Sequence, residues 1–258
     1  MSPPPTKSAQ AMTPEAMVRA IYRKLSRSWG PQHWWPAESA FEVIVGAILT
    51  QNTSWKNVER ALASLRSAGA LSPDATRALS LSELEPLVRS SGYYRQKAAR
   101  LKNFVSFLDE NYGGSLERMF AAPTGQLRAE LLALKGVGPE TADAILLYAA
   151  HHEVFVVDAY ARRILERHAA IASTAKYDEI RLLVEGALRR ERMATTGRAF
   201  DRPLAHEPSR MSTAERSQLA QVYNEMHGLL VQAGKHYCFK LEPNCQQCPL
   251  RGLLPLES

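Results

Sequence analysis

The 258-residue sequence contains no apolar stretch long enough to cross a membrane. Its longest apolar run, residues 43–49, is far shorter than the roughly 20 residues that a membrane-spanning helix needs. Residues 1–10 are rich in proline and serine and lack the apolar segment of a signal peptide. We therefore expect a cytoplasmic protein with no membrane segment, preceded by a disordered leader at residues 1–12.

Cysteine is scarce, and the three that are present lie close together near the end of the chain, at Cys238, Cys245 and Cys248. An odd number of cysteines argues against a disulfide framework. Thiols gathered in one short segment are typical of a metal-binding loop. The sequence therefore predicts a metal site at these three positions.

Acidic residues are fewer than basic ones, 26 against 32, which gives a formal net charge of +6. That excess favours an anionic partner. The 45% content of apolar residues is enough for a real core and excludes wholesale disorder.

Patterns typical of strands are nearly absent, since the only strand-like run, residues 154–157, is too short to form a sheet. Ser82 with Glu85 predicts a capping box, and Pro139 fits the first position of a helix that runs to about residue 150. Apolar residues recur at helical spacing in several segments, including Val58, Leu62 and Leu65, and Leu127, Leu131 and Leu134. The predicted fold class is all-α.

Residues 189–212 lack this helical spacing of apolar residues. They are rich in arginine, proline, serine and threonine and have few apolar residues. Such a composition predicts a long mobile loop between two helices. Its arginines could contact phosphates, although a solvated insertion is the more common role of a charged loop.

Residues 134–142 predict a helix, a turn with two glycines, Gly136 and Gly138, and a second helix. The exposed amides of such a turn, at the start of a helix, can bind a phosphate without reading sequence. An ordinary helix–helix turn would have the same pattern. Asp158, which follows the apolar run 154–157, could cap the next helix, act as a functional carboxylate, or do both.

Together these features resemble the helix–hairpin–helix DNA glycosylases of the endonuclease III superfamily. The motifs that carry the resemblance occur in the family's order, at residues 48–53, at 92–98, at 134–142 with Asp158, and at the three cysteines. The likeness covers residues 13–254.

The resemblance implies two helical lobes with a DNA-binding cleft between them. Residues 31–151 would form a helical barrel lobe that contains the hairpin. Residues 13–30 and 152–258 would form the second lobe, with 189–212 as an insertion.

The resemblance also implies site residues and a partner. Asp158 would be the catalytic carboxylate, and the protein would act as a monomer on damaged double-stranded DNA, associated with the nucleoid. The residues implied to contact DNA are Gln51, Arg95, Lys97, Lys135, Gly136, Val137, Gly138, Glu140 and Thr141.

Segments 34–36, 41–47 and 138–148 are most similar to 3-methyladenine DNA glycosylase III. That similarity implies a base pocket formed by Trp34, Trp35 and Trp55, and an electron-rich indole attracts a positively charged alkylated base. These tryptophans could instead pack the core. The lysine that follows His-Gly in that subfamily is Leu229 here, which leaves Lys235 either in the pocket or solvated near a helix end.

Bifunctional members of the superfamily carry a lysine where this chain has Glu140. A carboxylate cannot form a Schiff base with the sugar, so we expect a monofunctional glycosylase without efficient AP lyase activity. Its expected substrates are alkylated bases. The alternatives are a glycosylase for oxidised pyrimidines or mismatched thymine or uracil, and a non-catalytic protein that binds DNA damage.

The family's C-terminal loop holds a [4Fe–4S] cluster with four cysteines, and Leu254 stands at the fourth position here. Three outcomes stay open. The loop could hold the cluster with three cysteines and another ligand, such as His236, it could hold zinc, or it could be stabilised by packing alone.

Overall fold

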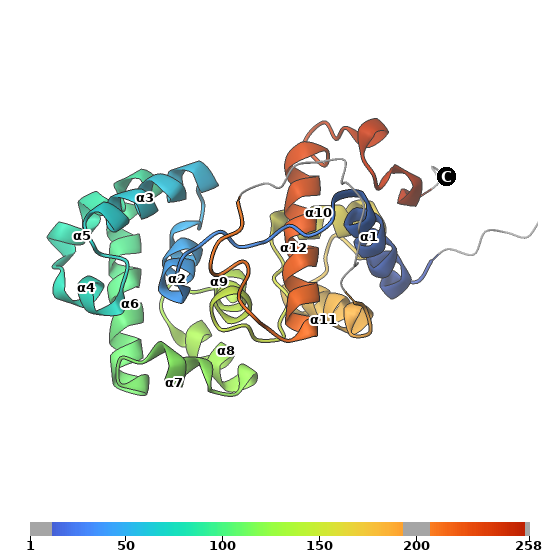
Figure 1. Cartoon of the computed structure of the whole chain (residues 1–258). Coiled ribbons are helices and arrows are strands. Elements are labelled where there is room, and N and C mark those ends of the chain that lie inside the picture. The colour runs from blue at the N-terminus through green and yellow to red at the C-terminus, as the bar shows by residue number, and fades with distance from the viewer. Residues whose placement is uncertain (1–11, 193–206, 256–258) are drawn as a thin grey trace, which may run out of the picture.

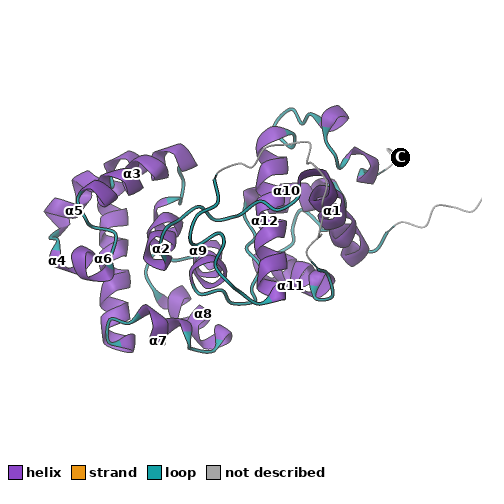
Figure 2. Cartoon of the chain, in the orientation of Figure 1, coloured by secondary structure: helices purple, strands orange, loops and turns teal. Residues whose placement is uncertain are grey.

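The computed structural model describes residues 12–192 and 207–255. In this part of the chain the regular elements are all helices, joined by loops and turns, with no strand (Figures 1 and 2). The all-α prediction is confirmed. The predicted leader, up to residue 11, and residues 193–206 of the predicted insertion lie outside the described residues. The longer elements are α1(Pro14–Trp29), α2(Ala40–Leu49), α3(Trp55–Ser67), α4(Pro73–Ala78), α5(Leu81–Leu87), α6(Tyr94–Tyr112), α7(Leu116–Phe120), α8(Thr124–Ala133), α9(Pro139–Ala144), α10(Ala159–Arg167), α11(Tyr177–Leu188) and α12(Gln218–His236).

The helices form two groups that meet at α2 and α9 (Figure 1). Helices α3 to α8 lie on one side, and α1 packs with α11 and α12 on the other. Helix α9 contacts α2 and α8, and the π-helical turn that continues it, Ile145–Ala149, contacts α2 and α12. Within the described ranges, no helix is long and apolar enough to cross a membrane.

Helix starts follow local capping chemistry. The hydroxyl oxygen of Thr13 accepts a hydrogen bond from the Ala16 amide at the start of α1. The capping box predicted at Ser82 lies instead at Ser80 and Glu83, so that prediction was wrong by two residues. Helix α5 begins at Leu81, which places Ser82 inside its first turn.

Residues 154–157 are extended and buried, but they do not form a strand. Their amides bind side chains of α11 in place of a neighbouring strand. The Phe155 amide donates to Oε1 of Glu185 at 2.9 Å, and the Val157 amide donates to the Tyr177 hydroxyl at 3.2 Å. These bonds fix the residue that follows, Asp158.

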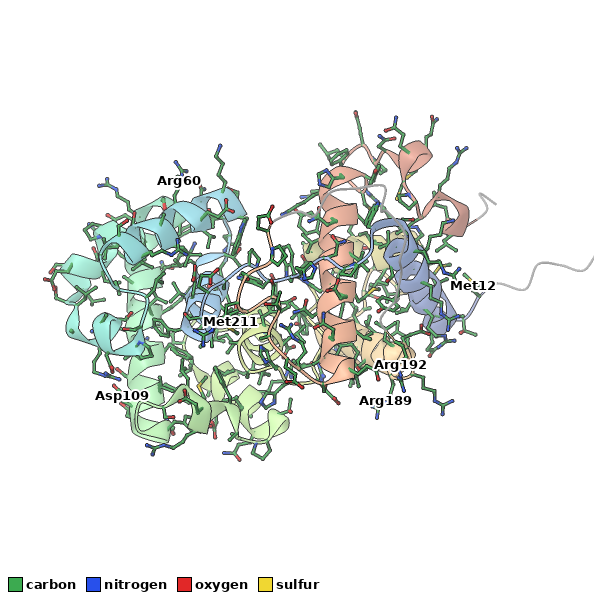
Figure 3. The ribbon with its side chains drawn as sticks, in the orientation of Figure 1. Met12, Arg60, Asp109, Arg189, Arg192 and Met211 are labelled. Atoms are coloured by element: carbon green, nitrogen blue, oxygen red, sulfur yellow. The ribbon has the colours of Figure 1, made fainter. Side chains whose placement is uncertain are left out.

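The second described end of the predicted loop 189–212, residues 207–212, is hydrogen-bonded to the chain near Ala37. The predicted mobility of the insertion stays a prediction. The Met211 amide donates to the Ala37 carbonyl at 3.0 Å, and the Ala37 amide donates to the Ser209 hydroxyl at 3.0 Å. Met211 is buried and lies in the middle of the molecule (Figure 3). The segment therefore covers the chain next to Trp35.

Candidate active site

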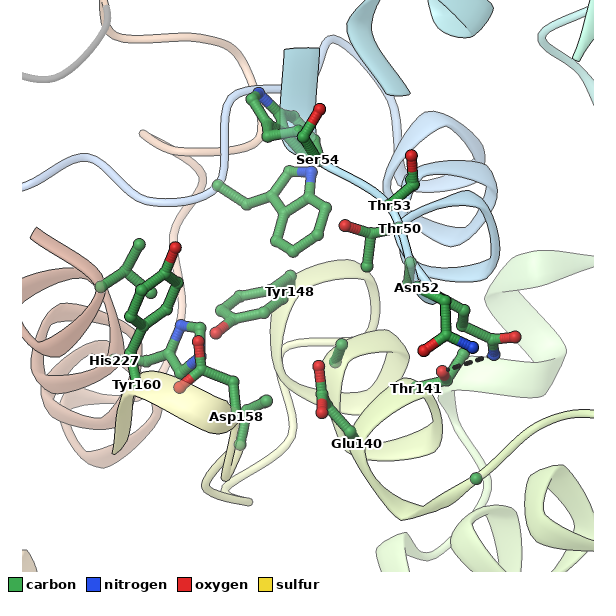
Figure 4. A pocket seen from close by; sticks show the side chains of 18 of the residues that line it. Thr50, Asn52, Thr53, Ser54, Glu140, Thr141, Tyr148, Asp158, Tyr160 and His227 are labelled. Carbon is green, nitrogen blue, oxygen red and sulfur yellow. Dashed lines mark hydrogen bonds and ion pairs between the residues drawn. The ribbon is translucent and has the colours of Figure 1, made fainter. Parts of the chain in front are cut away.

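A cavity of about 1150 Å³ lies where the two groups of helices meet (Figure 4). It gathers side chains from α2, α3, α9, α10 and α12, which are far apart in the sequence. The predicted site residues that line it are Trp34, Trp35, Gln51, Trp55, Gly136, Val137, Gly138, Glu140, Thr141, Asp158 and Lys235. Arg95, Lys97 and Lys135 are not among its lining residues.

Asp158 is the carboxylate at the floor of this cavity and also the N-cap of α10. Its Oδ1 accepts a hydrogen bond from the Ala161 amide at 2.7 Å, so the start of the helix fixes its orientation. Its Oδ2 lies 3.6 Å from Nε2 of His227, and its side chain is 14% exposed. One oxygen is therefore held by the helix, and the carboxylate remains accessible from the cavity.

His227 lies against Asp158 without a hydrogen bond, since 3.6 Å exceeds the usual limit. Burial lowers the pKa of His227, although the nearby Asp158 opposes that shift. Burial therefore disfavours the imidazolium form of His227 beside Asp158. Its ring packs against those of Trp34 and Tyr148, with centroids 6.0 and 5.7 Å apart.

Three further side chains line the cavity beside Asp158 and were not predicted from the sequence, namely His227, Tyr148 and Tyr160 (Figure 4). His227 could have been found from Lys235, because residues 227, 231 and 235 recur every four positions on α12 and all face the cavity. The inward direction of Tyr148 depends on packing between distant helices and has no local signal.

The three pocket tryptophans form one aromatic wall. The ring of Trp35 lies 4.9 Å from that of Trp55, nearly perpendicular to it, and 5.9 Å from that of Trp34. Tyr148 packs on Trp35 at 5.2 Å. Trp34 and Trp35 are each only 7% exposed, whereas Trp55 is half-buried. The same rings thus pack against the core and line the cavity, and their role in binding a base stays a prediction.

Lys235 extends along this wall from α12. Its Nζ lies 5.7 Å from the centre of the Trp34 ring, within the range of a cation–π contact. Burial lowers the pKa of Lys235, while the charges of Glu59 and Asp158 oppose that shift. The structure thus places Lys235 at the cavity, although its side chain keeps contact with solvent.

Glycines on the surrounding helices let the aromatic side chains approach closely. A Cβ on Gly228 would lie 3.0 Å from Cβ of Trp34, and one on Gly46 would lie 3.2 Å from the Trp35 ring. The tightest position is Gly234, where a Cβ would lie 2.1 Å from Cδ1 of Tyr160. The cavity wall therefore depends on glycines, which have no side chain, as well as on aromatic residues.

Gly234→Ala should destabilise the protein by about 1–3 kcal/mol, the usual cost of overpacking a core. The new methyl group would overlap the Tyr160 ring, although alanine is otherwise favoured over glycine in a helix. Gly186→Ala is the matched control, because Gly186 lies in α11 with nothing within 4 Å of a new Cβ, and it should stabilise slightly. Urea unfolding of both variants measures the difference, and equal stability would contradict the packing argument.

The hairpin between α8 and α9 favours glycine at its first glycine position because Gly136 has a positive φ of +88°. A Cβ there would also displace the flexible Arg100 side chain, whose Nε would lie 2.2 Å away. Gln51, from the end of α2, donates to the Gly136 carbonyl at 3.0 Å and to the Thr141 hydroxyl at 2.8 Å, and also binds Arg100. The side chain of Gln51 is thus tied to the hairpin at the mouth of the cavity.

Glu140 follows the hairpin and points into the cavity opposite Asp158 (Figure 4). Although more than a third of its surface stays accessible within the cavity, protein atoms surround its carboxyl group. This desolvation, together with the charge of Asp158, raises the pKa of Glu140 from 4.5 to about 7. Near neutral pH the cavity therefore holds two carboxyl groups, and Glu140 is only partly ionised.

Glu140→Gln should stabilise the protein at pH 8 and have no such effect at pH 4. Because folding raises the pKa of Glu140, it disfavours the ionised form. The resulting cost in folding free energy is absent below about pH 4.5, which is the pKa of Glu140 in the unfolded chain. The cost grows as the pH rises and reaches its full size above about pH 7. Melting temperatures at the two pH values measure it, with Glu15→Gln on exposed α1 as the control. An equal shift at both pH values would contradict the assignment.

Of the basic residues predicted to contact DNA, Arg95 and Lys135 are exposed, and Lys97 is not. Lys97 is 1% exposed and donates to the carbonyls of Leu49 and Ser91 at 2.8 and 2.6 Å. Its role as a direct DNA contact was therefore predicted wrongly. It instead links the Leu49 carbonyl at the end of α2 to the Ser91 carbonyl of the short turn Arg89–Ser91.

The three cysteines line a second, small hollow beside α10. This hollow shares no lining residue with the cavity beside Asp158. Leu254 also lines the hollow, whereas His236 does not. Across residues 12–192 and 207–255, no group of three histidine, cysteine, aspartate or glutamate side chains is arranged to hold a metal ion. A metal site at these cysteines therefore stays a prediction.

A glycine hairpin beside an aromatic cavity, with a helix-capping carboxylate at its floor, defines a protein of the helix–hairpin–helix class. The chain belongs to the HhH-GPD superfamily of base excision DNA repair proteins, whose family model matches residues 45–190. The sequence-based recognition of the endonuclease III superfamily is confirmed.

Known proteins agree with this membership. The chain is 41% identical to a Methanocaldococcus jannaschii protein named as a putative DNA repair glycosylase, over 91% of this chain and 94% of that one. The crystal structure of H. pylori 3-methyladenine DNA glycosylase bound to 1,N6-ethenoadenine matches with a TM-score of 0.69 and 29% identity, covering 90% of this chain and all of that one. An endonuclease III–DNA complex has the same fold, with a TM-score of 0.69 and 20% identity over 94% and 96% of the two chains.

Proposed function

We propose that this protein is a monofunctional DNA glycosylase that removes alkylated bases resembling 3-methyladenine from double-stranded DNA. One observation carries the proposal, namely that Asp158 faces a cavity walled by Trp34, Trp35 and Trp55. The cavity is larger than the roughly 300–1,000 Å³ of common small-ligand pockets, so it can admit a nucleotide turned out of the duplex.

Binding begins at the hairpin. The amides of Gly136 and Gly138 precede α9, and a phosphate accepts hydrogen bonds from amides at such a helix start. The Val137 amide already donates to the Leu134 carbonyl at 3.0 Å, so Val137 contributes through the shape of the turn. Lys135 and Arg95 add exposed positive charge nearby, which strengthens attraction to any DNA sequence. Gln51 lies beside the hairpin, where it can support the strand or fill the gap that the extruded base leaves.

The cavity selects bases by charge and shape. Alkylation at a ring nitrogen gives adenine a positive charge, and indole rings attract cations by about 0.5–2 kcal/mol or more when water is excluded. The H. pylori enzyme, which resembles this chain in fold and in sequence, is named for 3-methyladenine and was crystallised with an ethenoadenine. Both facts favour alkylated purines as substrates.

Catalysis then rests on Asp158. A base that carries a positive charge is already a good leaving group, so the bond from C1′ of the sugar to the base nitrogen breaks and its electron pair stays with the base. The Asp158 carboxylate stabilises the positive charge that develops on the sugar and orients a water. The water oxygen attacks C1′ and loses a proton, which leaves an abasic site in an intact strand.

Glu140 has no part in a lyase step, because a carboxylate cannot form a Schiff base with the opened sugar. We therefore expect no covalent adduct when the protein is treated with borohydride on an abasic duplex. Glu140→Lys, which restores the lysine of bifunctional relatives, is the matched variant for that trapping experiment. A strong adduct with the wild-type protein would overturn the monofunctional assignment.

Substrate class is tested by single-turnover reactions on duplexes that each carry one lesion. Release should be fastest from 3-methyladenine, slower from neutral alkylated purines, and absent from oxidised pyrimidines and from mismatched thymine or uracil. Preferred release of an oxidised pyrimidine or of a mismatched base would overturn the alkylated-base assignment. Tight binding of abasic DNA with no release from any duplex would overturn catalysis altogether.

A further inference from the structure

The hollow that the three cysteines line is enclosed by α10, the end of α12 and the C-terminal loop. Almost all of its lining surface is apolar. The groups on it that can bind a soft metal are Cys238, Cys245, Cys248 and the imidazole of His168. Sequence patterns gave no hint of His168, because it precedes the cysteines by some seventy residues.

His168 is held with one ring nitrogen ready to bind. Its Nδ1 lies 2.8 Å from the Ile164 carbonyl, and since a carbonyl can only accept, Nδ1 carries the proton. Nε2 then carries a lone pair, is buried, and has no hydrogen-bond partner. The Leu250 carbonyl also faces the ring, but a lone pair cannot donate to it. A buried nitrogen of this kind is costly unless something binds it.

The surroundings favour a bound cation held by thiolates. Nη1 of Arg167 donates to Sγ of Cys238 at 3.1 Å, and its other contacts are the carbonyls of Phe239 and Lys240. This guanidinium offsets the negative charge of coordinated thiolates, and hydrogen bonds to sulfur are a common feature around metal–thiolate centres.

The donor set fits a centre with three thiolates and one imidazole. Histidine replaces cysteine on iron in some iron–sulfur proteins, and zinc is bound by three cysteines and one histidine in many structural sites. The hollow measures only about 20 Å³, and the donors surround it without converging on one point. Cys245 and Cys248 are only partly buried. A single ion would require the loop that carries them to close, and a cluster would require it to open.

We propose that Nε2 of His168 is the fourth protein ligand of a metal centre whose other ligands are Cys238, Cys245 and Cys248. It takes the place of the missing thiol at Leu254, which lines the same hollow. His236, the neighbour of this segment in the sequence, has no part in the site. The centre ties α10 to the C-terminal loop, and it is independent of which lesion the protein removes.

The test is metal analysis of full-length protein purified without oxygen, together with its visible spectrum. Wild-type protein should hold iron and sulfide with absorption near 400 nm if the centre is a cluster, or one equivalent of zinc without colour if it is a single ion. His168→Ala should weaken metal binding by more than about 10–100-fold, the range seen for residues that only support a ligand. His236→Ala is the matched control and should keep the metal.

His168→Cys separates ligation from folding. A thiolate at that position should restore the metal and shift the spectrum toward that of an all-cysteine site, while His168→Ala remains folded by circular dichroism. Full metal content with an unchanged spectrum in His168→Ala would overturn the proposal. So would wild-type protein that binds neither iron nor zinc after expression with both.

Discussion

Replacing Asp158 by asparagine should lower the rate of base release by at least about 100-fold, within the 10²–10⁴-fold range of positioned acid–base groups. Asparagine has the same size, and its side-chain oxygen can still accept the hydrogen bond from the Ala161 amide. The helix cap and the fold are therefore preserved. What is lost is the negative charge that stabilises the sugar in the transition state. Single-turnover release of 3-methyladenine and DNA binding should be measured together.

Two further variants separate the two roles of this residue. Asp158→Ala removes both the charge and the cap, and should cost about 1 kcal/mol of stability in addition to activity. Asp178→Asn, on α11, removes a carboxylate that pairs with Arg128 and Arg181 outside the cavity, and should leave release intact. Undiminished release by Asp158→Asn would contradict the catalytic assignment, and weakened DNA binding with normal release would reassign the residue to binding.

Trp55→Leu should slow the release of a cationic base more than that of a neutral one. Trp55 is half-buried at the start of α3, and its ring stands nearly perpendicular to that of Trp35, so it presents an accessible surface to the cavity. Stacking on one aromatic ring is worth about 1–3 kcal/mol per base, or roughly 5–150-fold in rate or affinity. The cation–π attraction adds to that loss only for a charged base.

The measurement compares 3-methyladenine, which is cationic in DNA, with 1,N6-ethenoadenine, which is neutral and larger by one fused ring. Trp55→Phe is the graded control, because phenylalanine keeps a ring with a weaker attraction for cations. For the cationic base, we expect the release rate to fall from wild type to Trp55→Phe and further to Trp55→Leu. For the neutral base, we expect the same order with smaller differences between the three proteins. Equal losses on both bases would show that the wall selects shape alone, and no loss on either would remove Trp55 from the pocket.

Local patterns were enough to predict most of the fold. Helical spacing of apolar residues gives the helices, and the paired glycines give the hairpin, where Gly136 needs its positive φ. The position of Asp158 before a helix indicated its capping contact, whereas its place in the cavity was implied by the family resemblance. These features depend on neighbours in the sequence, so the sequence alone can reveal them.

For Lys97, the motif led to a wrong prediction, whereas the helical periodicity of α6 would have predicted its burial. Its place in a basic turn indicated DNA contact. However, residues 97, 101, 104 and 108 lie on one face of α6, and that face is buried. A charged residue at a core position of the helical pattern is expected to bind carbonyls, as Lys97 does. The position of Lys97 in the helical pattern therefore predicts its contacts better than the basic motif does.

The remaining features depend on packing between distant segments. Tyr148 and His227 meet Asp158 only because α12 packs against α10 and against the π-helical turn that holds Tyr148. His168 meets the cysteines only because the C-terminal loop folds back on α10. The docking of residues 207–212 on Ala37 is likewise set by long-range hydrogen bonds, and composition alone indicated a loop.

The most direct test of the central claim is to identify what the protein releases from alkylated duplex DNA. Wild-type protein should be incubated with DNA methylated at adenine N3, and the products separated by chromatography and mass spectrometry. We expect free 3-methyladenine and an abasic site in an unbroken strand, with Asp158→Asn releasing almost none. No free base from this DNA, or base release accompanied by strand cleavage, would contradict a monofunctional glycosylase for alkylated bases.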